Sequence, residues 1–219
     1  MWNPARTIVS IAFLGFGVAA AQTTTVAPPP TTDDSFVVKV LRLAEPAQYT
    51  RLTAKEKFEQ YLLASIGPAP DIGEAASAGI SQLADSPSEW GQGAAGYGRR
   101  VANNVAYNVV RQTITYGISI PAHEDTRYFA SNEDTAKERI RHALLSPVMA
   151  RRPDGRDHFS YSNTAGIVGA NLIQLSWAPP SWRTPGTLAT GMMWSYAGTA
   201  ALNLVREYVP DLIRKMKKQ

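Results

Sequence analysis

Apolar side chains recur every three or four residues along most of the chain after residue 52, which is the period of an amphipathic α-helix. Together with capping and breaking residues, this pattern predicts helices over 53–66, 70–84, 94–118, 131–146, 163–177 and 185–208, and a short basic helical end over 211–218. The β-branched run over 36–41 has the length of a strand but no evident partner. We therefore predict an all-α, compact bundle of about six helices with one short extended N-terminal arm.

Local signals mark where the chain starts a helix or turns. Thr53 and Glu56 have the spacing of a capping box, in which the two side chains satisfy free backbone amides at a helix start. The turn residues 153–156, followed by 158–161, predict a small hairpin between two helices. These signals are consistent with one helical domain over residues 52–219.

Small side chains recur at every fourth position of three predicted helices, and this spacing places them on one helix face. They are Ala94, Gly98, Ala102 and Ala106 in the third helix, Gly166 and Ala170 in the fifth, and Gly191, Ser195 and Thr199 in the sixth. Small side chains let helix backbones approach closely, both in membrane helix pairs and in soluble bundles. We expect these positions to form tight helix contacts, and the pattern leaves open which of the two settings applies.

The N-terminal segment predicts export. Residues 1–21 carry one positive charge at Arg6, then an apolar run that ends in small residues, as in a secretory signal peptide. The apolar run is shorter than the about 20 residues that a spanning helix needs. Residues 22–51 form a Thr- and Pro-rich spacer followed by the predicted arm. We therefore expect an exported protein, located in the periplasm or the cell envelope.

The charges are unevenly placed along the chain. The 22 Lys and Arg residues exceed the 18 Asp and Glu residues by four. Arg6 accounts for one positive charge, and residues 206–219 hold five basic against two acidic side chains, so residues 22–205 are neutral. A neutral body argues against a nucleic-acid-binding face. The absence of cysteine excludes disulfides, thiolate metal sites and a cysteine nucleophile.

Residues 158–205 contain a single formal charge, Arg183, and the tryptophans Trp177, Trp182 and Trp194. A basic end follows, with Arg214, Lys215, Lys217 and Lys218 as candidates for contact with a membrane surface. The stretch has few strong aliphatic side chains, so insertion as a spanning helix pair is disfavoured. Its composition favours a buried central hairpin of a helical bundle over that alternative.

Candidate chemistry is sparse. His123, Asp125 and His158 could form a metal or hydrolytic site only through tertiary contact, because they have no recognised ligand spacing. Glu89, beside Trp90, could act as an acid with a raised pKa, although no partner carboxylate is assignable. We expect no metal at these positions.

A literal GxGxxG pattern occupies residues 91–96 at the start of a helix. Dinucleotide binding through such glycines needs a strand that feeds the turn, and here a loop precedes it. We therefore expect a flexible helix entry that packs closely on a neighbour, and no cofactor.

Three segments, 91–99 (GQGAAGYGR), 123–129 (HEDTRYF) and 159–162 (FSYS), together resemble a family of uncharacterised exported proteins typical of acidobacterial-type bacteria. The resemblance covers roughly residues 52–212. It implies no activity, substrate or catalytic residue.

These observations lead to one main hypothesis and two alternatives. The main hypothesis is a non-enzymatic exported cell-envelope protein that contacts a membrane surface, or a second copy of itself, through residues 158–219. The first alternative is an envelope hydrolase or metal-dependent enzyme that uses His123, Asp125 and His158. The second is a carrier of a lipid or small apolar ligand, which requires an apolar cavity between the last two long helices.

Overall fold

The computed structural model describes residues 51–131 and 135–216, all of which belong to one compact unit of the chain, residues 34–219. The predicted signal peptide over 1–21, the spacer and the arm over 36–41 lie outside the described residues.

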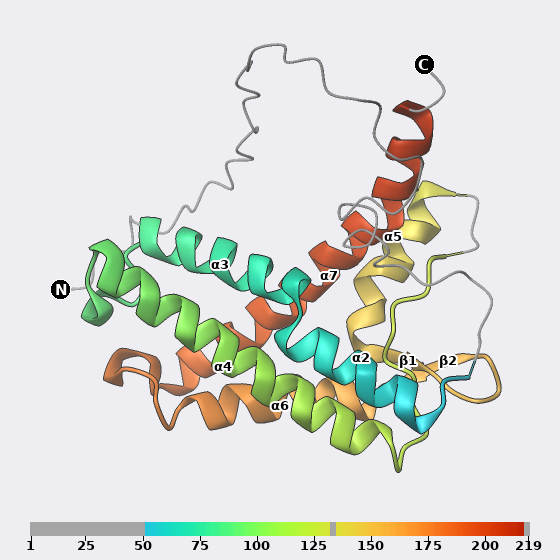
Figure 1. Cartoon of the computed structure of the whole chain (residues 1–219), viewed down its shortest axis with the longest axis horizontal. Coiled ribbons are helices and arrows are strands. Elements are labelled where there is room, and N and C mark those ends of the chain that lie inside the picture. Colours follow the sequence, from blue (N-terminus) through green and yellow to red (C-terminus); the bar gives the residue numbers. More distant parts are fainter. Residues whose placement is uncertain (1–50, 132–134, 217–219) are drawn as a thin grey trace, which may run out of the picture. The chain divides into compact units, whose positions relative to one another are not determined.

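The described residues are mostly helical, which confirms the predicted fold class (Figure 1). The helices are α2 (Ala54–Ile66), α3 (Pro68–Leu83), α4 (Gly93–Ser119), α5 (Ala136–Leu145), α6 (Tyr161–Gln174) and α7 (Pro185–Met216). Short 3-10 helices η1 (Ser88–Trp90), η2 (Ser146–Val148) and η3 (Pro180–Trp182) stand between them. The strands β1 (Met149–Arg151) and β2 (Asp157–Phe159) form an antiparallel hairpin where one was predicted. The predicted basic end is the last part of α7 and not a separate helix.

Side-chain caps explain where several helices begin. Thr53 and Glu56 form the predicted capping box at the start of α2, with Thr53 N donating to Glu56 Oε2 over 2.8 Å. Thr135 and Ser160 accept from backbone amides at the starts of α5 and α6 in the same way. These local bonds satisfy amides that would otherwise lack partners in the first helical turn.

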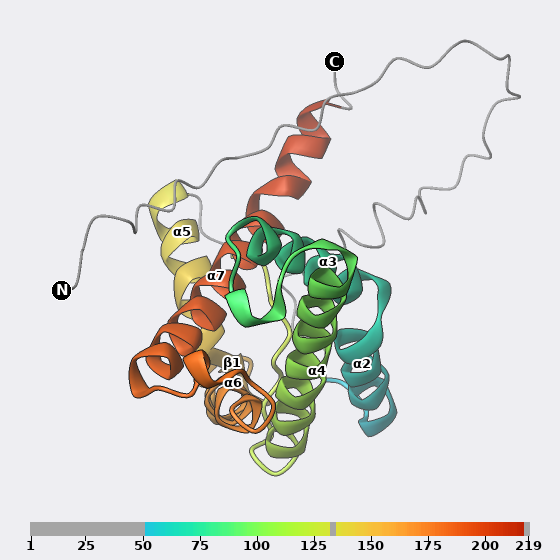
Figure 2. The ribbon, with the colours of Figure 1, turned by 90° about the vertical axis from the view of Figure 1, so that its left-hand side faces the viewer.

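Helix α4 lies at the centre of the helix contacts. It packs against α6 on one side and against α2 and α3 on another, while α7 packs against α5 and α6 (Figure 2). A polar cluster joins α4, α6 and α7: Asn171 Nδ2 donates to Tyr107 Oη over 3.0 Å, and Tyr107 Oη lies 2.7 Å from Ser195 Oγ. Arg111 adds a hydrogen bond to Thr199 Oγ1 over 3.0 Å.

Glycines set the close approach of these helices. A side chain at Gly166 would collide with Thr115 and would lie 3.1 Å from the backbone oxygen of Arg111, both on α4. At Gly191 on α7, a Cβ atom would stand 2.6 Å from Asn171 Oδ1 on α6. Ala170 of the same α6 face is fully buried. Only very small residues fit at these crossings.

The third-helix stripe does not form a helix contact of this kind. A Cβ atom at Gly98 would meet no atom within 4 Å, and Ala94 and Ala102 are exposed. The expectation of tight packing at Gly98 was therefore wrong. The fourfold spacing puts these residues on one face of α4, but that face is turned toward solvent and toward a cavity that Ala102 and Ala106 help to line.

The interior holds mainly small and polar side chains, and many large apolar side chains are exposed. The buried apolar residues of the described part are Ala78, Tyr128, Phe129, Ala143, Ala150, Ile167, Ala170, Ala178 and Ala200. The bulkiest fully buried side chains are instead Arg100, Glu124, Ser160 and Ser162. Large apolar side chains are at least one-third exposed on every helix of the described residues, from Phe58 on α2 to Val205 on α7. This distribution departs from the apolar core that most water-soluble domains have.

Alanine substitutions at Gly166 and Gly98 should change the free energy of unfolding in different ways, because only Gly166 lies in a close helix contact. Gly166→Ala should lower the free energy of unfolding by about 1–3 kcal/mol, because Thr115 or the α4 backbone must move. Gly98→Ala should leave it unchanged or raise it by up to about 1 kcal/mol, because the site is open and alanine favours a helix. Urea denaturation of both variants measures the difference, and equal stability of the two would contradict the packing.

Candidate functional site

The structure does not bring the predicted catalytic residues into one site. His123 lies in the exposed turn after α4, with a positive φ of 53°. Asp125 is buried and forms a bidentate ion pair with Arg127, in which Nη2 lies 2.7 Å from Oδ2. His158 is on β2, where its Nε2 lies 2.8 Å from Asp154 Oδ2 of the hairpin turn.

Metal binding has no support in the described part of the chain. Residues 51–131 and 135–216 contain no group of three or more His, Asp or Glu side chains arranged to hold a metal ion. Asp125 already engages Arg127 and, through its backbone, Arg151, while His158 engages Asp154.

Glu89 also differs from its expected role. It is exposed on η1, and a hydrogen bond with Ser181 holds the pKa of its carboxyl group below the ordinary value. The sequence suggested an acid with a raised pKa, which required burial against Trp90. Solvent and the Ser181 hydroxyl stabilise the charged form instead, so that interpretation was wrong.

Glu124, for which the sequence suggested no role of its own, lies in the turn after α4 and is 1% exposed. Its carboxylate contacts the first residues of α6. It accepts hydrogen bonds from Ser162 N, Tyr161 N and Ser160 Oγ over 3.0 Å each, and from Ser162 Oγ over 2.5 Å. Burial raises the pKa of Glu124, but these donors outweigh burial and hold the pKa below its ordinary value. The carboxylate therefore fastens the turn after α4 to the first turn of α6, and its oxygens are occupied.

Glu207 makes a second buried connection, between α7 and the elements before it. Its Oε2 accepts from Tyr128 Oη over 2.5 Å, and its Oε1 accepts from Arg139 Nε of α5 over 2.9 Å. Burial, together with this hydrogen bond, raises the pKa of Tyr128. The segment HEDTRYF thus contributes Glu124, Asp125 and Tyr128 to structural contacts. Glu124 and Tyr128 bond residues far along the chain, so the local sequence could not reveal these contacts.

The GxGxxG loop surrounds a buried cation. Arg100 is 1% exposed, and its guanidinium donates to the carbonyl oxygens of Ser86 (3.0 Å), Pro87 (2.9 Å) and Gly91 (2.7 Å). A side chain at Gly96 would collide with Gly91 O. Gly91 and the preceding residues Ser86 and Pro87 thus direct their carbonyl groups toward the protein's own Arg100, and Gly96 leaves room for the Gly91 carbonyl group.

Exposed apolar side chains lie on both α6 and α7, and neither helix has a charged residue before position 206. We define the outer face of α6 and α7 by six side chains that are each more than one-third exposed: Val168, Leu172, Met193, Trp194, Leu202 and Val205. Met193 and Trp194 are 71% and 65% exposed, which is unusual for side chains of this size. The exposed positions of α7 from 186 to 205 include no charged residue.

This arrangement corrects the prediction of a buried central hairpin. The inward side of α6 and α7 carries Asn171, Ser195 and Asn203 besides Ile167 and small residues, while several large apolar side chains, Met193 and Trp194 above all, are exposed. Within the described residues, no helix is both long enough and apolar enough to cross a membrane. The side chains of Arg214 and Lys215, and all of Lys217 and Lys218, lie outside what the structure describes.

A second exposed apolar surface, not anticipated from the sequence, lies on α2 and α3. It includes Leu63, Ile66, Ile72, Ile80 and Leu83, of which Leu83 is 83% exposed. In Figure 1 α3 lies across α4 from α6, so this surface is separate from the outer face of α6 and α7.

A shallow cavity of about 280 Å³ lies along the N-terminal half of α4. Its lining residues are Trp90, Arg99, Ala102, Asn103, Ala106 and Trp177. The carrier hypothesis required a cavity between the last two long helices, α6 and α7. The cavity is instead on α4, between η1 and the residues that follow α6.

Glu74 on α3 is a part-buried group whose charge state changes near neutral pH. Burial raises its pKa to about 7, although the charge of Arg111 partly opposes this shift. Burial also lowers the pKa of Arg111, so both groups are held in surroundings that disfavour charge.

Comparison of the chain with protein-family models, with curated proteins and with solved structures found no match.

Stability should fall as the pH rises through the pKa of Glu74. Its pKa is about 7 in the folded protein and 4.5 ordinarily, so the folded state keeps a proton that the unfolded state has lost, and stability falls between about pH 4.5 and pH 7 and is level above. Glu74→Gln removes the loss, and after allowance for solvent screening it should stabilise the protein by about 2 kcal/mol at about pH 8. The difference should vanish at about pH 4, where both forms are neutral. Thermal unfolding at the two pH values measures it, and a pH-independent difference would argue against burial of the charge.

Proposed function

We propose that the protein is a non-enzymatic, exported cell-envelope component that lies against a membrane surface through residues 158–219. The observation that carries the proposal is the outer face of α6 and α7, with Met193 and Trp194 as its most exposed apolar side chains. The chain keeps this face free of charge over the whole exposed side of α7 up to Val205.

Physical chemistry favours a lipid surface as the partner of this face. Removing apolar surface from water gains about 25 cal/mol per Å², so the exposed side chains favour a partner that is itself apolar. Tryptophan prefers the interface between lipid and water, and Trp194 is one of the two most exposed side chains of the face. Helices that bind in this plane need an apolar side but not the length of a spanning helix.

The basic C-terminal end supports the same orientation. Four Lys and Arg residues occur over 214–218, after the segment 206–213 that carries Arg206, Glu207 and Asp211, and each contributes about 1 kcal/mol near an anionic lipid surface. The last turns of α7 extend beyond α2, α3 and α4 in both views (Figures 1 and 2).

The non-enzymatic part of the proposal is supported by the arrangement of the polar residues. The buried carboxylates Glu124 and Glu207 have their oxygens engaged by the protein's own donors. His158 and Asp125 are engaged in separate pairs.

Vesicle flotation of the chain from residue 22 tests this proposal. The double variant Met193→Asp and Trp194→Asp should lower binding to phosphatidylglycerol vesicles at least about tenfold, because each such side chain contributes about 1.5–3 kcal/mol when buried. Phosphatidylcholine vesicles should bind the wild-type chain more weakly, since the basic end then lacks its anionic partner.

The matched control places the same charges on the other apolar surface. Ile80→Asp with Leu83→Asp should leave flotation unchanged, although both side chains are at least as exposed as Trp194. Equal loss in the two double variants, or no binding by the wild type, would refute the assignment of the face. Light scattering of the same samples separates a membrane partner from self-association, which would depend on protein concentration.

A further inference from the structure

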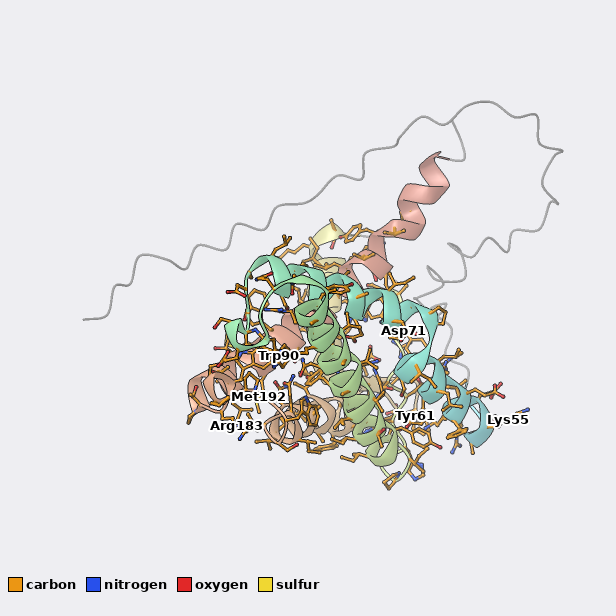
Figure 3. All side chains as sticks on the ribbon, turned by 60° about the vertical axis from the view of Figure 1, so that its left-hand side comes forward. Lys55, Tyr61, Asp71, Trp90, Arg183 and Met192 are labelled. Carbon is orange, nitrogen blue, oxygen red and sulfur yellow. The ribbon has the colours of Figure 1, made fainter. Side chains whose placement is uncertain are left out.

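The cavity on α4 has two tryptophan side chains in its lining, from segments far apart in the chain. Trp90 belongs to η1, and Trp177 follows the end of α6. Trp90 also packs against Trp182 of η3, with 5.3 Å between ring centroids. Figure 3 shows Trp90 on the side of α4 where Arg183, the neighbour of Trp182, also lies. We call this cavity the tryptophan cleft.

One tryptophan is held by a buried amide. Asn103 of α4 is 7% exposed, and its Oδ1 accepts from Trp177 Nε1 over 3.1 Å and from Gln174 Nε2 over 2.9 Å. The indole of Trp177 is therefore fixed in position before any ligand arrives.

The other tryptophan is held by the Arg100 anchor. The loop that carries Trp90 is tied through the carbonyl groups of Ser86, Pro87 and Gly91 to this buried guanidinium. Trp177 is thus held by its own hydrogen bond to Asn103, and Trp90 is held through the hydrogen bonds between its loop and Arg100. A rigid site loses little conformational entropy when it binds, so an open cleft of this kind is prepared for a ligand.

The small residues of α4 keep the cleft open. Ala102 and Ala106 lie one helical turn apart and line it between the aromatic groups. A larger side chain at either position would occupy the space. This gives the third-helix stripe a role other than helix packing.

The lining identifies the ligand as largely apolar. Four of the six lining residues are tryptophan or alanine, and the Asn103 oxygen already accepts two hydrogen bonds. A sugar or nucleotide would find few partners for its polar groups and would lose affinity on desolvation. The volume of about 280 Å³ lies just below the usual range for drug-sized ligands, and it suits a single chain or ring.

The charge at the edge identifies the polar end of the ligand. Arg99 is exposed and lines the cleft, and its Nη1 donates to Trp90 O over 3.3 Å. No acidic residue is among the lining residues. A guanidinium beside an apolar cleft complements a carboxylate or phosphate attached to an apolar chain.

We propose that the tryptophan cleft binds the single apolar chain of an anionic amphiphile, with Trp90 and Trp177 in contact with the chain and Arg99 paired with the anionic head. This assignment does not rest on the membrane proposal, because the cleft is lined by none of the six side chains of the outer face.

Laurate binding to the purified exported protein tests the assignment, with tryptophan fluorescence and calorimetry as readouts. Ala102→Leu should fill the cleft and weaken laurate binding at least about tenfold, equivalent to about 1.4 kcal/mol. Ala94→Leu is the matched control on the same helix. Ala94 is exposed and does not line the cleft, so its substitution should leave the affinity unchanged.

Arg99→Gln tests the head group without altering the apolar lining. It should weaken laurate binding about tenfold and leave the affinity for neutral dodecanol unchanged. Circular dichroism of each variant verifies the fold. Absence of laurate binding by the wild type, equal affinity of Ala102→Leu and wild type, or an equal loss for laurate and dodecanol in Arg99→Gln would each overturn the proposal.

Discussion

Asn171 on α6, Tyr107 on α4 and Ser195 on α7 meet in one hydrogen-bonded cluster, and the positions of the three helices follow from it. Polar groups removed from water must find partners, so the helices pack only in the register that pairs them. Gly166 lets α6 approach α4, and Gly191 lets α7 approach Asn171, so that these side chains reach one another. Buried hydrogen bonds also fix two further elements: Glu124 ties the turn after α4 to α6, and Glu207 ties α7 to α5.

An interior filled by small and hydrogen-bonded residues has a consequence for the surface. Apolar residues make up 44% of the chain, which is an ordinary share, yet many of the large ones in the described residues are exposed. The exposed apolar side chains of α6 and α7 and the tryptophan cleft on α4 are therefore two results of one packing arrangement. In both places the protein presents apolar groups on a frame that is held by buried polar contacts.

Local sequence signals predicted the fold class, the capping box of Thr53 and Glu56, and the hairpin between α5 and α6, because each depends on residues close together in the chain. Contacts between distant segments were beyond such signals. Periodicity placed Gly98 on a stripe but could not tell which way the stripe faced. Glu124 looks like an ordinary loop residue until Ser160 and Ser162, 36 and 38 residues later, are brought to it.

Helix α7 has 32 residues in one unbroken helix, which corresponds to about 48 Å at about 1.5 Å per residue. Its first turn follows η3, whose Trp182 packs on Trp90, and its last turns lead into the basic segment. Pro210 stands inside this helix, one turn before the basic segment, and lacks the backbone N–H that would donate to the carbonyl of residue 206. The helix can therefore bend at this turn, so a reorientation of the basic end reaches the helix start near the tryptophan cleft only after this joint has taken up part of it.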